Sequence, residues 1–132
     1  MADKRDSAAA ARLAIKALED KKGQDIRVID ISAVSVLADY FIIANGTNKS
    51  QIQAMADSVA QELGHAGYIC KQMEGYQTAN WVLLDFGDVI VHIFDPKNRL
   101  LYDLERIWRD GVQIDPDALG EEDAGQEEES SD

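Results

Sequence analysis

The feature that most constrains the fold is a pair of apolar runs separated by a two-residue turn. Residues 81–86 (Trp-Val-Leu-Leu-Asp-Phe) and 89–94 (Val-Ile-Val-His-Ile-Phe) flank Gly87 and Asp88. Glycine at the first turn position favours a type II′ turn, which joins two antiparallel strands. In that register one face is wholly apolar and belongs to the core, and it consists of Val82, Leu84, Phe86, Val89, Val91 and Ile93.

The opposite face of this predicted β-hairpin mixes aromatic, aliphatic and ionisable side chains. The facing pairs are Trp81 with Phe94, Leu83 with His92, and Asp85 with Ile90. Tryptophan is a frequent anchor of protein contacts because it buries a large area at low entropic cost. Two interpretations stay open on the hairpin pattern alone: a partner contacts this face, or a helix covers it as core. Likewise, His92 is either half-packed at an edge or a pH-sensitive contact residue.

The remaining segments predict one domain over residues 1–114, with the element order α-β-β-α-β-β-β-α. Further elements are expected as helices at 7–19, about 50–63 and 100–109, and as strands at 26–31, 40–44 and 68–74. Asp6 or Ser7 should cap the first helix, Gly64 or Gly67 should end the second, and residues 95–99 should form a turn. Strand 40–44 is apolar throughout, which is typical of a central strand. The predicted fold class is α/β or α+β, a mixed sheet of about five strands with flanking helices.

Charge divides the chain into two parts. The net charge is −12, and nine of the 25 acidic residues lie from Asp115 to Asp132, where there is no basic residue. Residues 1–114 carry 16 acids against 13 bases and are nearly balanced. Residues 115–132 have little to bury and are predicted to be a disordered acidic tail, either solubilising or binding a basic partner. The acidity argues against a direct grip on nucleic acid or a membrane surface.

No local pattern favours catalysis, a cofactor or a metal. Cys70 is the single cysteine, which is typical of a cytoplasmic protein, and no signal peptide or membrane-spanning run is present. His65 and Cys70 lack zinc-ligand spacing, and Asp85 with Asp88 has no third ligand nearby. The segment 45–47 (Asn-Gly-Thr) precedes a helix and could hold a phosphate, but it is not a P-loop. The Asp-x-Asp spacing that two-metal nucleotidyl transfer uses occurs only at 115–117, in the predicted tail.

Several motifs, taken in order, resemble the ribosomal silencing factor (Iojap) family. They span about residues 8–110, with the acidic tail outside, and they are 38–43 (Ala-Asp-Tyr-Phe-Ile-Ile), 45–48 (Asn-Gly-Thr-Asn), 74–75 (Glu-Gly), Trp81, 85–94 (Asp-Phe-Gly-Asp-Val-Ile-Val-His-Ile-Phe), Arg99 and 102–105 (Tyr-Asp-Leu-Glu). The resemblance implies a sheet related to nucleotidyltransferases without their catalytic carboxylates. It also implies a non-enzymatic factor that binds the fourteenth protein of the large ribosomal subunit, blocks joining of the small subunit and lowers translation under starvation.

An acidic protein suits a basic ribosomal protein as its partner, and a steric block requires affinity rather than turnover. The docking surface that we expect from the resemblance and the hairpin consists of Glu74, Gly75, Trp81, Leu83, Asp85, His92, Tyr102 and Glu105. Three alternatives stay open: a nucleotidyl-transfer enzyme, a factor for assembly of the large subunit, and a homodimer of the free protein through the same hairpin face.

Overall fold

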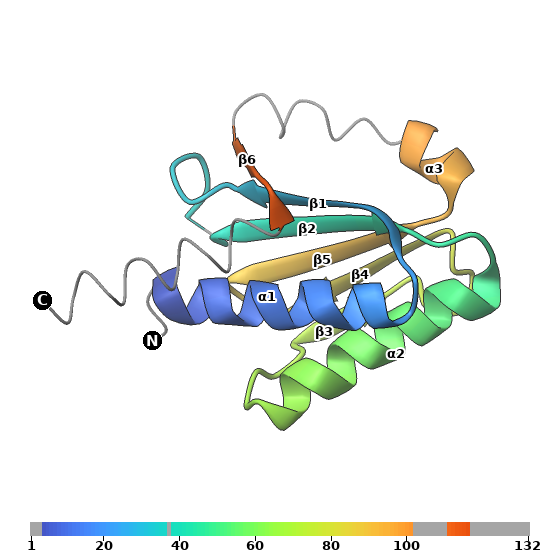
Figure 1. Cartoon of the computed structure of the whole chain (residues 1–132), viewed down its shortest axis with the longest axis horizontal. Helices are drawn as coiled ribbons and strands as arrows, with labels where there is room; N and C mark the ends of the chain where they lie inside the picture. The colour runs from blue at the N-terminus through green and yellow to red at the C-terminus, as the bar shows by residue number, and fades with distance from the viewer. Residues whose placement is uncertain (1–3, 37, 102–110, 117–132) are drawn as a thin grey trace, which may run out of the picture.

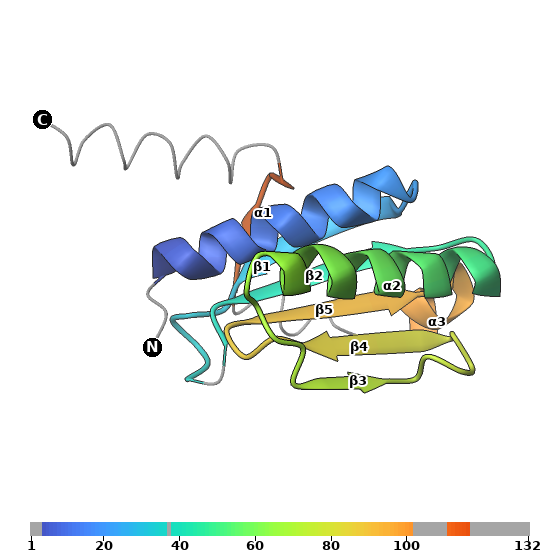
Figure 2. The same ribbon diagram turned by 90° about the horizontal axis from the view of Figure 1, so that it is seen from below.

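A computed structural model describes residues 4–36, 38–101 and 111–116 of the chain. Its elements, in chain order, are α1 (Lys4–Asp20), β1 (Gln24–Asp30), β2 (Tyr40–Asn45), α2 (Lys49–His65), β3 (Gln72–Glu74), β4 (Trp81–Asp85), β5 (Val89–Phe94), α3 (Pro96–Leu101) and β6 (Val112–Ile114). Helices α1 and α2 lie side by side against one face of a sheet, and α3 lies beyond the end of β5, away from them (Figures 1 and 2). The predicted mixed sheet with flanking helices is confirmed.

The sheet has six strands within the described residues, in the order β3-β4-β5-β2-β1-β6. Strands β2 and β5 pair in parallel, whereas the other neighbours pair antiparallel. Strand β2 therefore lies inside the sheet between β5 and β1. Four of its six side chains are buried, as expected of a central strand with apolar residues on both faces.

The hairpin of β4 and β5 has the predicted register. Trp81 faces Phe94 and Leu83 faces His92. Gly87 has a φ of 91°, the left-handed conformation that its turn position requires, and the Phe86 N–H donates to the Val89 carbonyl over 2.9 Å. The predicted core face is confirmed, since five of its six side chains are buried and Phe86 packs against them at the rim.

The main core lies between this face and the two long helices. Helix α2 contributes the predicted stripe, all of it buried: Ile52, Met55, Ala56, Val59 and Leu63. Helix α1 contributes mostly alanines, whose small side chains allow close approach: Ala8, Ala10, Ala11, Ala14 and Ala17. Each fully buried Leu or Ile stabilises the fold by about 1.5–3 kcal/mol relative to exposure, so this layer carries much of the stability. No helix of the described residues has the length and apolarity needed to cross a membrane.

Local hydrogen bonds define both ends of α2. The Asn48 side chain caps the first turn by accepting from the Gln51 N–H. After the C-cap Ala66, Gly67 adopts a φ of 95°. Tyr68 N–H then donates to the Leu63 carbonyl over 2.8 Å, which completes a Schellman motif. Gly67, and not Gly64, therefore ends the helix, because Gly64 is still helical.

The N-terminal helix begins earlier than predicted. Helix α1 starts at Lys4, so neither Asp6 nor Ser7 is its cap, and that expectation was wrong. Ser7 is instead 1% exposed, and its hydroxyl donates to the Asp39 carboxylate over 2.7 Å. This tertiary contact ties α1 to the loop before β2 and gives a buried polar group a partner.

Two further corrections concern the C-terminal part. The expected turn at 95–99 is helical from Pro96, because Asp95 caps the helix by accepting from the Asn98 N–H over 2.7 Å and proline suits the first helical position. Strand β6 was not expected, and it pairs with β1 at the edge of the sheet. The remainder of the predicted helix 100–109 and residues 117–132 of the predicted tail lie outside the described residues.

Candidate functional site

Six of the eight predicted site residues come together around β3, β4 and β5. Glu74 pairs with Leu83, which in turn pairs with His92, so the three form one row across the sheet. Strand alternation directs this row, and Trp81 and Asp85 beside it, away from the face that α1 and α2 cover. We call this face the second face. The other two predicted site residues, Tyr102 and Glu105, lie outside the described residues.

Aromatic rings are concentrated on the second face. Trp81 stacks on Phe94 with ring centroids 5.3 Å apart, and Phe41 meets the His92 ring edge-on at 4.9 Å. We call these four residues the aromatic cluster. Phe94 is fully buried, whereas Trp81 and Phe41 are partly exposed. The second face is therefore neither wholly core nor wholly surface, and the sequence could not decide this. Phe41 was not predicted to lie on the second face, because only the parallel pairing of β2 with β5 brings it to the other members of the cluster.

His92 is buried rather than half-packed or exposed. It is 4% exposed, and its Nδ1 accepts a hydrogen bond from the Trp81 indole N–H over 3.0 Å. The proton of the neutral ring must then be on Nε2, which is buried with no hydrogen-bond partner in the described part of the chain. Burial lowers the pKa of His92 from 6.5 to about 4. The ring is therefore neutral at pH 7 and lies beneath the surface of the second face.

This histidine makes the stability of the fold depend on pH. Between pH 6.5 and about 4 the unfolded chain binds a proton at His92 that the folded chain does not, so stability falls as the pH falls. We expect the free energy of unfolding of the wild type to drop by about 2 kcal/mol more than that of H92N between pH 7 and pH 5. Urea unfolding at each pH measures the difference, and the common carboxylate contribution cancels. Equal losses in both proteins would contradict the neutral buried state of His92.

The loop from Gly75 to Asn80 fixes the approach to Trp81. Gly75 has a φ of 80°, and a Cβ atom at this position would lie 2.1 Å from the Trp81 carbonyl oxygen. Helix α2 holds the loop through Gln53, which donates to the Tyr76 carbonyl, and through Asp57, which accepts from the Tyr76 hydroxyl, both over 2.9 Å. The loop is therefore tied to the core layer. Gln53, Asp57 and Tyr76 are site-supporting residues that sequence reasoning missed, since no spacing rule links them.

The two predicted site carboxylates differ in their surroundings. Glu74 is exposed, and it accepts a hydrogen bond from the Gln72 side chain on the same strand. Asp85 is partly buried, and its Oδ1 accepts from the Gly87 N–H over 2.8 Å, so it also shapes the hairpin turn. Among the described residues, no group of three or more His, Cys, Asp or Glu side chains could hold a metal ion, Asp85 with Asp88 included.

At residues 45–47, which the sequence left open as a phosphate site, the N–H groups of Gly46 and Thr47 already have partners within the protein. The Gly46 N–H donates to the Phe94 carbonyl, and the Thr47 N–H donates to the Gln51 side chain. The Gln51 N–H in turn bonds the Asn48 side chain. These three hydrogen bonds therefore hold β2, β5 and α2 together.

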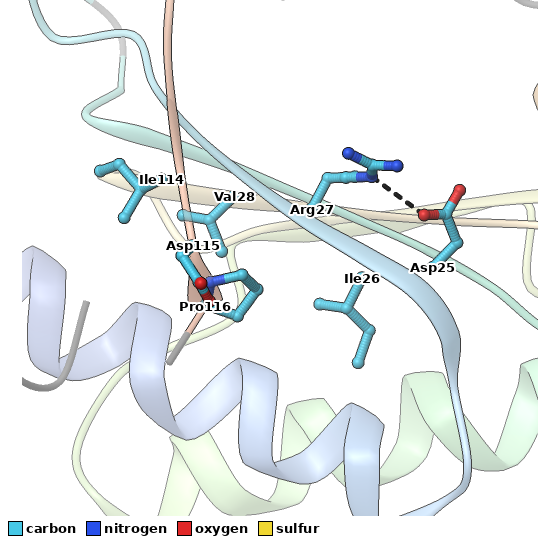
Figure 3. A pocket seen from close by; sticks show the side chains of 7 residues that line it. All are labelled: Asp25, Ile26, Arg27, Val28, Ile114, Asp115 and Pro116. Carbon is cyan, nitrogen blue, oxygen red and sulfur yellow. Dashed lines mark hydrogen bonds and ion pairs between the residues drawn. The ribbon is translucent and has the colours of Figure 1, made fainter. Parts of the chain in front are cut away.

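A groove of about 470 Å³ lies at the far edge of the sheet, lined by residues of β1 and by the chain from the end of β6 to Pro116 (Figure 3). An ion pair of Arg27 with Asp25, 2.9 Å long, lies at its rim. The residues that line the groove are Asp25, Ile26, Arg27, Val28, Ile114, Asp115 and Pro116. None of them is a predicted site residue, and β2 and β5 separate the groove from β4.

Comparison with known proteins identifies the family. The family described as "Ribosomal silencing factor during starvation" matches residues 4–132. The chain belongs to the ribosomal silencing factor family. The match runs past residue 110 and through the acidic segment, which the sequence motifs had left outside the resemblance.

Individual similar proteins agree with this assignment. The ribosomal silencing factor of Bacillus subtilis is 40% identical over 106 residues, which cover 80% of this chain and 90% of that protein. A crystal structure of a protein from Chromobacterium violaceum has a TM-score of 0.74 and 42% identity, covering 76% of this chain and 83% of the other. A mouse protein named for mitochondrial assembly of the ribosomal large subunit is 28% identical over 99 residues.

Proposed function

We propose that this protein binds the large ribosomal subunit through its fourteenth protein and blocks association with the small subunit, thereby lowering translation during starvation. Membership of the ribosomal silencing factor family supports a ribosomal role. The observation that carries the docking site is the grouping of Glu74, Leu83 and the partly exposed Trp81 on the second face. This grouping combines an aromatic anchor, an aliphatic neighbour and a carboxylate, which suits a protein partner.

Charge favours a basic partner for this surface. Glu74 and Asp85 lie on the same face as Trp81, and the whole chain has a net charge of −12. Carboxylates at the rim of an interface pair with Arg or Lys and steer association, whereas the same charges repel the phosphates of ribosomal RNA. We therefore place the contact on ribosomal protein rather than on RNA.

The proposed mechanism is steric and takes place in the cytoplasm. A factor bound where the small subunit must approach excludes it by occupying space, so no bond in the ribosome is made or broken. Affinity and residence time decide the effect. This makes the protein a regulator without a catalytic centre, in keeping with the names of its relatives.

Co-sedimentation tests the proposal directly. The purified protein is centrifuged through sucrose with separated large subunits, separated small subunits and joined ribosomes. We expect it to move with free large subunits and to be largely absent from the small-subunit and joined-ribosome fractions. Adding it before the small subunits should reduce the joined fraction. Absence from the large-subunit fraction would overturn the proposal.

The name of the mouse relative favours one second candidate, a role in assembly of the large subunit. Both roles use binding to the large subunit, but they differ in what happens when the protein is missing. Deletion of an assembly factor causes immature large subunits to accumulate in growing cells. Deletion of a silencing factor instead leaves the subunits normal and causes excess translation during starvation. Subunit profiles of a deletion strain in both conditions distinguish the two.

The charge on Glu74 should contribute modestly to binding. Removing it in E74Q is expected to weaken binding to large subunits by about threefold and to reduce the loss of affinity with added salt, because exposed charge pairs are worth about 0.2–1 kcal/mol. Glu62 provides the control, since it is an exposed acid on α2, which covers the other face of the sheet. E62Q should bind like the wild type. If E62Q weakens binding as much as E74Q does, only net charge matters and Glu74 is not at the interface.

A further inference from the structure

We propose that His92 is a positioning residue that holds the Trp81 indole in the orientation that docking requires. The inference rests on the proposed function, because it assigns a task at the same surface. It differs from the sequence-based expectation, in which His92 itself contacts the partner. Here the buried imidazole acts only through Trp81.

The geometry on the second face supports this task. Trp81 and His92 lie on adjacent strands and on the same face, two residues apart in the register of β4 and β5. The indole N–H donates to Nδ1 over 3.0 Å, while the indole face stacks on Phe94 at an interplanar angle of 23°. One contact fixes the plane of the indole and the other fixes its direction within that plane. A partly exposed tryptophan held in both ways is pre-organised for a partner, which lowers the entropic cost of binding.

The imidazole is itself held rigidly. Phe41 meets it edge-on at 4.9 Å, and Phe94 lies nearly parallel to it at 9° with centroids 6.2 Å apart. The ring is 4% exposed, so a partner that covers the second face meets Trp81 before it meets His92. The acceptor is therefore fixed before any partner arrives.

The unpaired nitrogen makes a purely space-filling role a poor explanation. Nε2 carries the ring proton and has no partner in the described part of the chain, and burying such a donor is unfavourable. A leucine would fill similar space without that cost. What leucine cannot supply is an acceptor for the indole N–H, and within the described residues this is the one hydrogen bond that the His92 ring makes.

Three variants test the hydrogen bond separately from packing. H92N keeps an acceptor, because the asparagine Oδ1 occupies the place of Nδ1 on Cγ. H92L removes the acceptor and replaces the imidazole with an apolar side chain of similar size. V91A removes buried volume on the opposite face of β5 and controls for loss of stability alone. Urea unfolding of each variant gives the folded fraction by which the binding data are corrected.

The first readout does not require ribosomes. Hydrogen exchange of the Trp81 indole N–H is followed by NMR in the full chain, and its signal is assigned with W81F. We expect the indole N–H of H92L to exchange at least about tenfold faster than that of the wild type. In H92N and V91A its exchange rate should lie within about threefold of the rate set by the global unfolding of each variant. Equal protection in H92L and the wild type would overturn the proposal.

The second readout is the dissociation constant for large subunits. We expect H92L to bind about tenfold more weakly, H92N to recover most of that loss, and V91A to bind normally. A double-mutant cycle with W81F covers the case in which H92L folds poorly, because the H92N and H92L effects should shrink when the indole N–H is gone. Full binding by folded H92L, or undiminished effects in W81F, would overturn the inference. If the wild type itself does not bind large subunits, the proposed function fails, and the exchange data still decide whether His92 orients Trp81.

Discussion

Replacing Trp81 by alanine should weaken binding to large ribosomal subunits by about thirtyfold or more. The loss corresponds to about 2 kcal/mol, as for other aromatic anchors at protein interfaces. Trp81 is partly exposed on the second face, beside Leu83 and Glu74 through the pairing of β3, β4 and β5. Its removal deletes the largest side chain with which that face can meet a partner. The dissociation constant is measured by titrating labelled protein with large subunits.

An exposed apolar residue elsewhere provides the control for the Trp81 experiment. Ile69 is 77% exposed in the segment between α2 and β3, near the opposite end of the hairpin from Trp81. I69A should bind like the wild type. Because W81A also loses the stacking on Phe94, its folded fraction is measured in parallel. Normal binding by folded W81A would show that the docking surface lies elsewhere.

Replacing Gly75 by alanine should destabilise the protein by about 3 kcal/mol, through both strain and a clash. At a φ of 80° an alanine is strained, and its Cβ would lie 2.1 Å from the Trp81 carbonyl oxygen. That oxygen belongs to the backbone of β4, so relief of the clash requires the loop or the strand to move. We therefore expect G75A to lose binding as well as stability. Urea unfolding and binding titrations measure the two losses.

Two other glycines separate the causes of the Gly75 effect. Gly64 is helical with nothing within 4 Å of an added Cβ, so G64A should gain about 1 kcal/mol from helix propensity. Gly67 has a φ of 95° but equally open space, so G67A should lose only the cost of strain. The expected order of stability is G64A, wild type, G67A and G75A. A G75A variant as stable as G67A would show that the loop yields without cost.

Local patterns predicted the elements that local interactions determine. The β4–β5 register follows from a two-residue turn with glycine first, so each cross-strand pair from Trp81 to Phe94 could be derived from residue numbers. The buried stripe of α2 follows from helical spacing alone. In both cases the partners are within a few residues along the chain, and one periodicity fixes all of them.

The failures have long-range causes. Ser7 resembles a helix cap by residue type, but its partner Asp39 is 32 residues away. Strand β6 has only three residues, and its pairing with β1 spans more than 80 positions. The early start of α3 is different, because the Asp95-Pro96 pair is a local signal for a helix start that the prediction passed over.

The candidate site was predicted in part for the same reason. Alternation along β4 and β5 was enough to group Trp81, Leu83 and His92 on one face. The depth of His92 depends on β2, which pairs in parallel with β5 and brings Phe41 beside the imidazole. Strands that pair in parallel are not joined by a tight turn, so the sequence carries no local signal for this pairing. The burial of His92 and its low pKa could therefore not be predicted.

The position of β2 between β1 and β5 also has a consequence for synthesis of the chain. Its neighbour β1 leaves the translating ribosome first, but β5 ends only at Phe94, about fifty residues after β2. During that interval one edge of an apolar strand has no pairing partner, and such an edge readily pairs with the wrong chain. Helix α1, which is made before β2 and packs against it, is the first element that can shelter one face of β2 before its second edge is closed. The step at which the nascent chain becomes safe from aggregation is the arrival of the β4–β5 hairpin, which also completes the aromatic cluster.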